Sequence, residues 1–186
     1  DGFIMENNLV LNEVASESNV PIIIGCIRAE KNALYNSAAI CFEGKLQKYC
    51  DKILLPNYDV FDEKRFFHSG QRPKVFRIPI NDRSRKIGIQ ICEDMWDDDY
   101  NCKVSALQKE MGAELIINIS ASPYHENKIS ERIEHVSLKA KQLRLPFIYC
   151  NMIGGQEELI FDGSSFAISK KGLLLSQAKS FKEDLK

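Results

Sequence analysis

The feature of this sequence that most constrains its fold is a series of short, branched apolar runs that alternate with longer stretches of helical periodicity. Gly, Pro or polar residues bound each run, as is typical of buried strands. The runs are "PIIIGCIR" (21–28), "NSAAICF" (36–42), "KIGIQI" (86–91), "ELIINI" (114–119) and "PFIYCNM" (146–152). Continuous apolar runs of this kind indicate a sheet that is covered on both faces.

Helical periodicity occupies much of the remaining chain. Apolar residues recur at helical spacing over residues 101–112 and 130–144, and more weakly over 4–18. Alternation of strands and helices predicts a layered α/β fold. In the tail, "FDGSSFAIS" and "KKGLLLS" predict two strands joined by a tight turn at Gly172. No repeat or linker interrupts the chain, so we expect one domain over residues 1–186.

Charge and cysteine usage exclude several classes of protein. Lys and Arg number 25 against 26 Asp and Glu, so the net charge is −1 and no field of one sign favours nucleic acid or an anionic membrane. No apolar stretch approaches the ~20 residues of a bilayer span. The six cysteines form no C-x-x-C pair, which argues against a zinc site or a disulfide framework. We expect a cytoplasmic protein without a metal, a nucleic-acid partner or a membrane partner.

Cys92 has the position of a nucleophile. The predicted strand 86–91 runs directly into Cys92, which is followed by "EDMWDDDY" and then by a predicted helix. Backbone N–H groups and a helix dipole at such a junction favour a thiolate and a developing oxyanion. The alternative is an inert cysteine, because free cysteines are among the most buried residues. None of the other five is flanked by polar groups that would tune its thiol, and they are predicted to be structural: Cys26, Cys41, Cys50, Cys102 and Cys150.

Three further segments place polar side chains beside predicted strands. "KILLPNYDVFDEKRFF" carries Lys52, Tyr58 and Glu63 in an extended loop. "NISASPYHENK" and "YCNMIGGQEELIFDG" follow strands directly, so Ser122 is expected at the carboxyl edge of the sheet, where open α/β proteins bind ligands. Each segment taken alone also fits an ordinary loop or turn.

An acidic run follows Cys92. Its members are Asp94, Asp97, Asp98 and Asp99. Such a run can suggest magnesium, but carboxylates before a helix more often cap it and complement its dipole. We therefore expect caps here.

Four segments in this order resemble the carbon–nitrogen hydrolase (nitrilase) superfamily, and within it the glutaminase domains of glutamine-dependent NAD synthetases. The resemblance extends over residues 21–168 and is carried by "KILLPNYDVFDEKRFF", "ICEDMW", "INISASPYHENK" and "YCNMIGGQEELIFDG". It implies a four-layer αββα sandwich and a Glu, Lys and Cys triad, with Lys52 as the lysine and Cys92 as the nucleophile. It also implies a set of residues that hold glutamine: Tyr58, Glu63, Glu93, Trp96, Ser122 and Lys128.

The chain departs from the family pattern at three places. The family's general-base glutamate lies on a strand well before the glycine that matches Gly25, whereas only 24 residues precede Gly25 here. Together with Asp1 at the start, this predicts a domain that is truncated at its N-terminus. Met152 stands where many relatives have glutamine. No phosphate-binding "SGGxDS" or Walker-type loop occurs, so the ATP-dependent synthetase domain, with its ATP and Mg²⁺, is expected to be absent and no cofactor is expected in this domain.

The resemblance implies hydrolysis of the glutamine side-chain amide through a Cys92 thioester, with ammonia supplied for NAD synthesis from deamido-NAD. The implied partners are glutamine, a synthetase domain of the same polypeptide and further copies in a homo-oligomer. Two alternatives stay open: a free-standing nitrilase-type amidase that acts on another small amide, and a non-catalytic remnant that lacks the general base.

Overall fold

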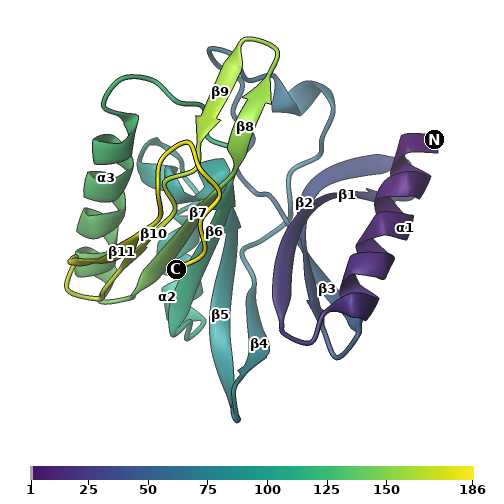
Figure 1. Ribbon diagram of the computed structural model, residues 1–186, viewed down its shortest axis with the longest axis horizontal. Coiled ribbons are helices and arrows are strands. Elements are labelled where there is room, and N and C mark those ends of the chain that lie inside the picture. The colour runs from purple at the N-terminus through teal and green to yellow at the C-terminus, as the bar shows by residue number, and fades with distance from the viewer. Residues whose placement is uncertain (1) are drawn as a thin grey trace.

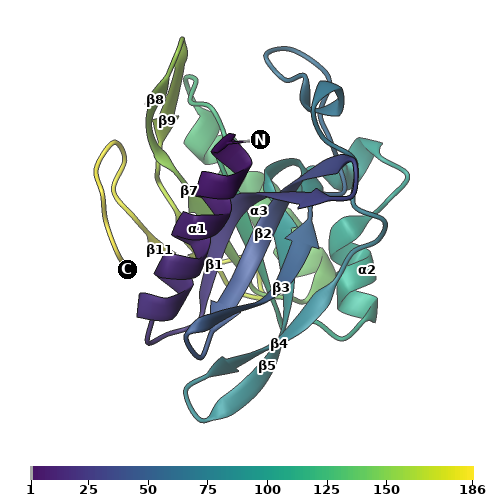
Figure 2. The same cartoon turned by 90° about the vertical axis from the view of Figure 1, so that its right-hand side faces the viewer.

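Four layers build the protein. A computed structural model describes residues 2–186, and Figure 1 shows two sheets face to face with helices outside them. The first layer is α1 (Gly2–Glu17). The second is an antiparallel sheet of β1 (Ile22–Glu30), β2 (Ala33–Phe42) and β3 (Lys45–Asp51), in that order. Figure 2 shows α1 lying across the outer face of this sheet.

The third layer is a six-stranded sheet with the order β11-β10-β7-β6-β5-β4. Its central strands β5, β6 and β7 are parallel, and the remaining pairs are antiparallel. The bounds are β4 Val75–Ile80, β5 Arg83–Ile91, β6 Leu115–Ser120, β7 Phe147–Asn151, β10 Phe166–Ile168 and β11 Leu174–Gln177. The fourth layer consists of the crossover helices α2 (Val104–Glu110) and α3 (Lys128–Leu143).

Smaller elements gather at one end of the sheets. The hairpin of β8 (Ile153–Gln156) and β9 (Leu159–Asp162) projects beyond the sheets at the top of Figure 1. Three 3₁₀ turns are η1 (Glu63–Arg65), η2 (Cys92–Met95) and η3 (Asp97–Asp99). The loops at this end follow the carboxyl ends of β5, β6 and β7.

Apolar side chains fill the three spaces between the layers. Between the sheets, Ala38, Ile40 and Cys50 meet Ile78, Ile87, Ile89 and Ile91. Leu11 and Ala15 of α1 pack on Ala39 and Cys41 of β2, while Val136 and Ala140 of α3 pack on Ile116 and Phe147. This layering confirms the αββα sandwich that the resemblance implies.

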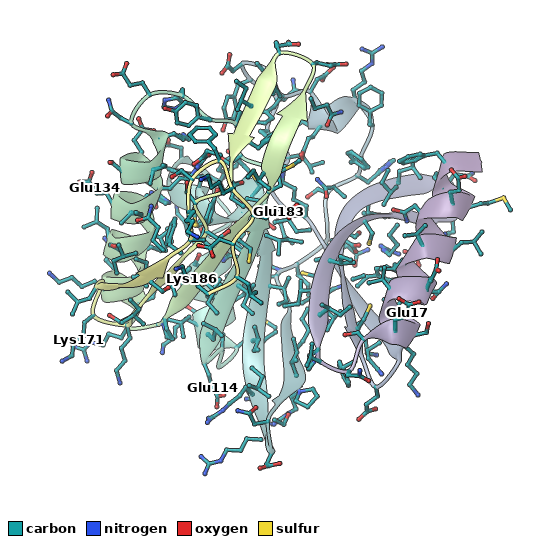
Figure 3. All side chains as sticks on the ribbon, viewed as in Figure 1. Glu17, Glu114, Glu134, Lys171, Glu183 and Lys186 are labelled. Atoms are coloured by element: carbon teal, nitrogen blue, oxygen red, sulfur yellow. The ribbon has the colours of Figure 1, made fainter. Side chains whose placement is uncertain are left out.

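Charged side chains cover the outside. Glu17, Glu114 and Lys171 are exposed and project from the ribbon in Figure 3. No helix among residues 2–186 combines the length and the apolar character needed to cross a membrane.

The five strands and three helices expected from the sequence are present, within a few residues of their expected bounds. The tail hairpin is also present, and Gly172 has the positive φ (78°) that its turn requires. The sequence reading missed β3, β4 and the β8–β9 hairpin. β3 is rich in polar residues, Pro79 interrupts β4 at the sheet edge, and Gly154 and Gly155 made β8 look like a loop.

We predict that Ile89→Ala lowers the free energy of unfolding by about 2–5 kcal/mol, because Ile89 is 1% exposed between the two sheets and its truncation leaves a cavity. Ile160, which is 54% exposed, is the matched control, and its change to alanine should cost less than about 0.5 kcal/mol. Urea unfolding measures both. Equal losses in the two variants would contradict the assignment of this core.

Candidate active site

Cys92 lies at a sharp turn where β5 ends. Its φ is +45°, a left-handed conformation that is uncommon for a residue with a Cβ and that surrounding contacts must hold. Asn118 of β6, which is fully buried, donates from Nδ2 to the Cys92 carbonyl oxygen at 3.1 Å. Asp94 accepts the N–H of Ile91 at 3.1 Å. Hydrogen bonds on both sides therefore fix the turn.

Cys92 lines two neighbouring cavities. The larger, about 720 Å³, also contains Tyr58, Glu93, Trp96, Ser122 and Lys128. The smaller, about 310 Å³, also contains Lys52 and Glu63. All eight residues that the resemblance points to thus gather at one place, with Cys92 between the two groups. Their catalytic and binding roles remain predictions.

Lys52 follows β3 and is paired with Glu63. The Lys52 side chain is 2% exposed, and its Nζ lies 2.7 Å from each carboxylate oxygen of Glu63. Asn36 donates to Glu63 Oε1 at 3.3 Å, and the Asn36 carbonyl accepts the Lys52 N–H at 2.8 Å. The cation therefore has a fixed position beside Cys92, with its charge balanced.

The Cys92 thiol is predominantly protonated at neutral pH. Burial raises its pKa, and the charge of Lys52 opposes that rise only in part. The sequence-based expectation that a helix dipole at Cys92 favours the thiolate is wrong. Residues Cys92–Met95 form a 3₁₀ turn, and α2 begins only at Val104. Reaction at this thiol therefore needs a base that removes its proton.

Glu93 presents a carboxylate to the larger cavity. It is 5% exposed and accepts the hydroxyl of Tyr58 at 2.9 and 3.0 Å and that of Tyr100 at 2.9 Å. Burial, followed by the contact with Glu93, raises the pKa of both phenols, that of Tyr100 to about 12. Both phenols therefore stay protonated and keep donating to the carboxylate.

Aromatic and basic groups also line the larger cavity. Trp96 stacks on His135 with ring centroids 4.2 Å apart, and Lys128 Nζ lies 4.9 Å from the Trp96 centroid. Ser122 Oγ accepts hydrogen bonds from buried Arg132 at 3.2 and 3.3 Å, which leaves its hydroxyl hydrogen available to a ligand.

Sequence reasoning missed four contributors to the site: Asn118, Tyr100, Arg132 and His135. A polar residue inside the apolar run "LIINIS" was the available signal for Asn118. Arg132 and His135 lie on α3, and in the sequence they look like polar residues on the solvent-exposed face of a helix. Only the fold shows that this part of α3 faces the loop after β5.

The acidic run has mixed roles. Asp97 accepts the N–H of Ser105 in the first turn of α2 at 3.1 Å and pairs with Lys139, so it caps the helix as expected. Asp94 accepts the N–H of Ile91 at the start of the 3₁₀ turn η2 and so caps that turn as expected, and it also accepts the N–H groups of Ile53 and Leu54. Within residues 2–186, no three His, Cys, Asp or Glu side chains are grouped so as to hold a metal.

Comparison with known proteins gives a consistent result. The profile of a family described as carbon-nitrogen hydrolase matches residues 9–185. A glutamine-dependent NAD(+) synthetase of Thermotoga maritima is 37% identical in an alignment of 186 residues that covers 98% of this chain and 31% of that protein. One from Aquifex aeolicus is 41% identical over 152 residues, covering 82% of this chain and 26% of that protein.

Solved structures agree with the fold. The glutamine-dependent NAD+ synthetase from Acinetobacter baumannii superimposes with a TM-score of 0.86 at 34% identity, over 95% of this chain and 32% of that one. A carbon-nitrogen hydrolase from Helicobacter pylori has a TM-score of 0.80 at 23% identity, over 98% of this chain and 66% of that one, and shows the shared fold. The chain spans about a third of the length of the synthetases it matches.

We predict that Glu63→Gln destabilises the protein more than Lys52→Met does. The first change leaves the nearly inaccessible Lys52 ammonium without its counter-charge, whereas the second leaves a carboxylate that is 20% exposed and can be hydrated. The expected losses are about 2–3 kcal/mol and about 1 kcal/mol, reduced for the partial exposure of Glu63. Urea unfolding of both variants and of the double variant tests the order, and the reverse order would refute it.

Proposed function

Because the chain belongs to the carbon–nitrogen hydrolase family, we propose that it is a glutaminase domain that hydrolyses the side-chain amide of glutamine through a thioester on Cys92. The ammonia serves NAD synthesis from deamido-NAD in a synthetase domain of the same polypeptide. The two relatives named glutamine-dependent NAD(+) synthetase, at 37% and 41% identity, support this choice of substrate. We place the enzyme in the cytoplasm as a homo-oligomer.

One observation carries the proposal: Cys92 lies between a cavity of about 720 Å³ that Glu93 and Lys128 line and a smaller cavity that holds a buried lysine. The first cavity offers an anionic Glu93 and a cationic Lys128, which complement the α-ammonium and α-carboxylate of an amino acid. Trp96 supplies a flat apolar wall for the methylene groups. The side-chain amide then extends toward Cys92.

The first chemical step is attack of the Cys92 sulfur on the amide carbonyl carbon. A general-base carboxylate takes the thiol proton, as the raised pKa of Cys92 requires. The family resemblance assigns this base to a glutamate on a strand well before Gly25, whereas the described residues before β1 form the helix α1 and no strand. The Lys52 ammonium and the backbone N–H that follows Cys92 stabilise the oxyanion of the tetrahedral intermediate.

The remaining steps release the two products. The protonated base gives its proton to the departing nitrogen, the C–N bond breaks, and ammonia leaves a thioester on Cys92. The base then takes a proton from water, and the resulting hydroxide attacks the thioester. The C–S bond breaks, glutamate departs, and the base returns its proton to the Cys92 sulfur, which restores the thiol. Glu63, whose two oxygens both contact Lys52, orients and neutralises the cation during these steps.

We predict that Cys92 forms the acyl intermediate and reacts with a diazo-ketone analogue of glutamine. In a polypeptide that also carries the general-base glutamate, mass spectrometry of the Cys92 peptide should detect the adduct, and Cys92→Ala should abolish it together with ammonia release. Cys150 is exposed and serves as the control, since Cys150→Ala should leave both unchanged.

A panel of amides in the same assay shows which substrate the protein prefers, from the rate of ammonia release. Glutamine should release ammonia faster than asparagine or short aliphatic amides. Preference for an aliphatic amide would favour the free-standing amidase, and labelling spread over all six cysteines would refute the role of Cys92.

We predict that Lys52→Met slows acylation at least about 10²-fold, because one donor aimed at a developing oxyanion contributes about 3 kcal/mol. Rapid-quench mass spectrometry measures the acylation rate directly. Binding of glutamine should change little, since Lys52 lines the smaller cavity and not the amino-acid cavity. An unchanged acylation rate in a folded variant would remove Lys52 from the mechanism.

A further inference from the structure

Lys52 and Cys92 belong to different layers of the protein. Lys52 follows β3 of the three-stranded sheet, and its backbone bonds to Asn36 of β2 and to Gly70. Cys92 follows β5 of the six-stranded sheet. The two sheets meet largely through apolar side chains, whose attraction has no preferred direction. Apolar packing alone therefore fixes the relative position of the two residues only loosely.

Asp94 connects the two layers with directed bonds. Its Oδ1 accepts the N–H groups of Ile53 at 2.9 Å and Leu54 at 2.8 Å, the two residues directly after Lys52. Its Oδ2 accepts the N–H of Ile91 at 3.1 Å, directly before Cys92. The side chain is 1% exposed, so water does not compete for these donors.

We infer that Asp94 is a positioning residue that sets the distance between the Lys52 ammonium and the Cys92 sulfur. This inference rests on the proposed roles of Lys52 and Cys92. Asp94 acts through the backbone N–H groups of the two residues after Lys52 and of the one residue before Cys92. Its carboxylate bonds both segments at once. Hydrogen bonds to a charged acceptor are stronger than neutral ones, so a carboxylate holds the two layers together more firmly than a neutral side chain would.

Asp94→Asn removes the hydrogen bonds of Asp94 to one of the two segments. The amide keeps one oxygen acceptor, but its NH₂ group replaces the other oxygen and faces a backbone donor. Depending on its orientation, the amide loses either the Ile91 contact or the contacts to Ile53 and Leu54. The side-chain volume is nearly unchanged, so the variant tests the bonds and not the packing.

Alkylation of Cys92 by a small neutral electrophile tests the inference. The charge of Lys52 lowers the Cys92 pKa, so a displaced Lys52 leaves less thiolate at a given pH. We expect Asp94→Asn to move the pH profile of Cys92 alkylation upward by about one unit. At a fixed pH below the midpoint, this shift corresponds to about tenfold slower alkylation. Loss of the Asp94 charge alone would lower the Cys92 pKa, so unchanged or faster alkylation overturns the inference.

A double-mutant cycle with Lys52→Met separates positioning from general loosening. If Asp94 acts by placing Lys52, Asp94→Asn causes no further slowing once Lys52 is gone. The same slowing in the Lys52→Met background overturns the inference. Asp97→Asn is the matched control: Asp97 is a buried aspartate of the same segment that contacts Ser105 and Lys139, so alkylation of Cys92 should stay within about twofold of the wild-type rate.

Alkylation needs no glutamine, so this result is independent of the substrate. If glutamine is not hydrolysed while the cycle gives the expected pattern, only the proposed function fails. If Asp94→Asn does not fold, amide hydrogen exchange in the unmodified protein tests whether Asp94 holds the two segments together. The amides of Ile53, Leu54 and Ile91 should exchange slowly and with one common opening free energy. Protection factors, which correct each rate for the intrinsic exchange of that amide, that differ by more than about tenfold overturn the inference.

Discussion

The apolar contact between the two sheets is the constraint on which the rest of the structure depends. Ile40 from one sheet and Ile87 and Ile89 from the other are almost completely buried in it. It brings the end of β3 beside the end of β5, and the site is built from the loops at that junction. Neither sheet alone contains both Lys52 and Cys92, so chemistry at this site requires that the layers be assembled.

The polar groups of the site are stabilised in pairs before any substrate arrives. Lys52 is balanced by Glu63, and Glu93 is held by two phenols whose pKa values are raised. Such pairing offsets the cost of burying charge and prevents the side chains from reorganising during the reaction. The Cys92 thiol differs, because burial keeps it protonated until a base acts. This arrangement suits the role proposed for Cys92, that of a nucleophile that is activated only with substrate in place.

The sequence predicts the layers and the main site residues but not how the site is held together. Continuous branched apolar residues predict buried strands such as 86–91 and 114–119, and the family resemblance predicts Lys52 and Cys92 as site residues. Polar strands such as β3 carry little local signal, because their burial depends on a neighbouring sheet. The contacts of Asp94 with Ile53 and Leu54 could not be predicted for a related reason: these residues lie about 40 positions away in the chain and only the fold brings them near.

The central claim is that residues from two sheets act on one amide group, and a crystal structure of the protein with the diazo-ketone glutamine analogue bound to Cys92 tests it most directly. The account predicts that the analogue's carbonyl oxygen lies within hydrogen-bonding distance of Lys52 Nζ, with its amino-acid end between Glu93 and Lys128 in the larger cavity. An adduct with its amino-acid end in the smaller cavity, or with the carbonyl oxygen turned away from Lys52, would contradict the account.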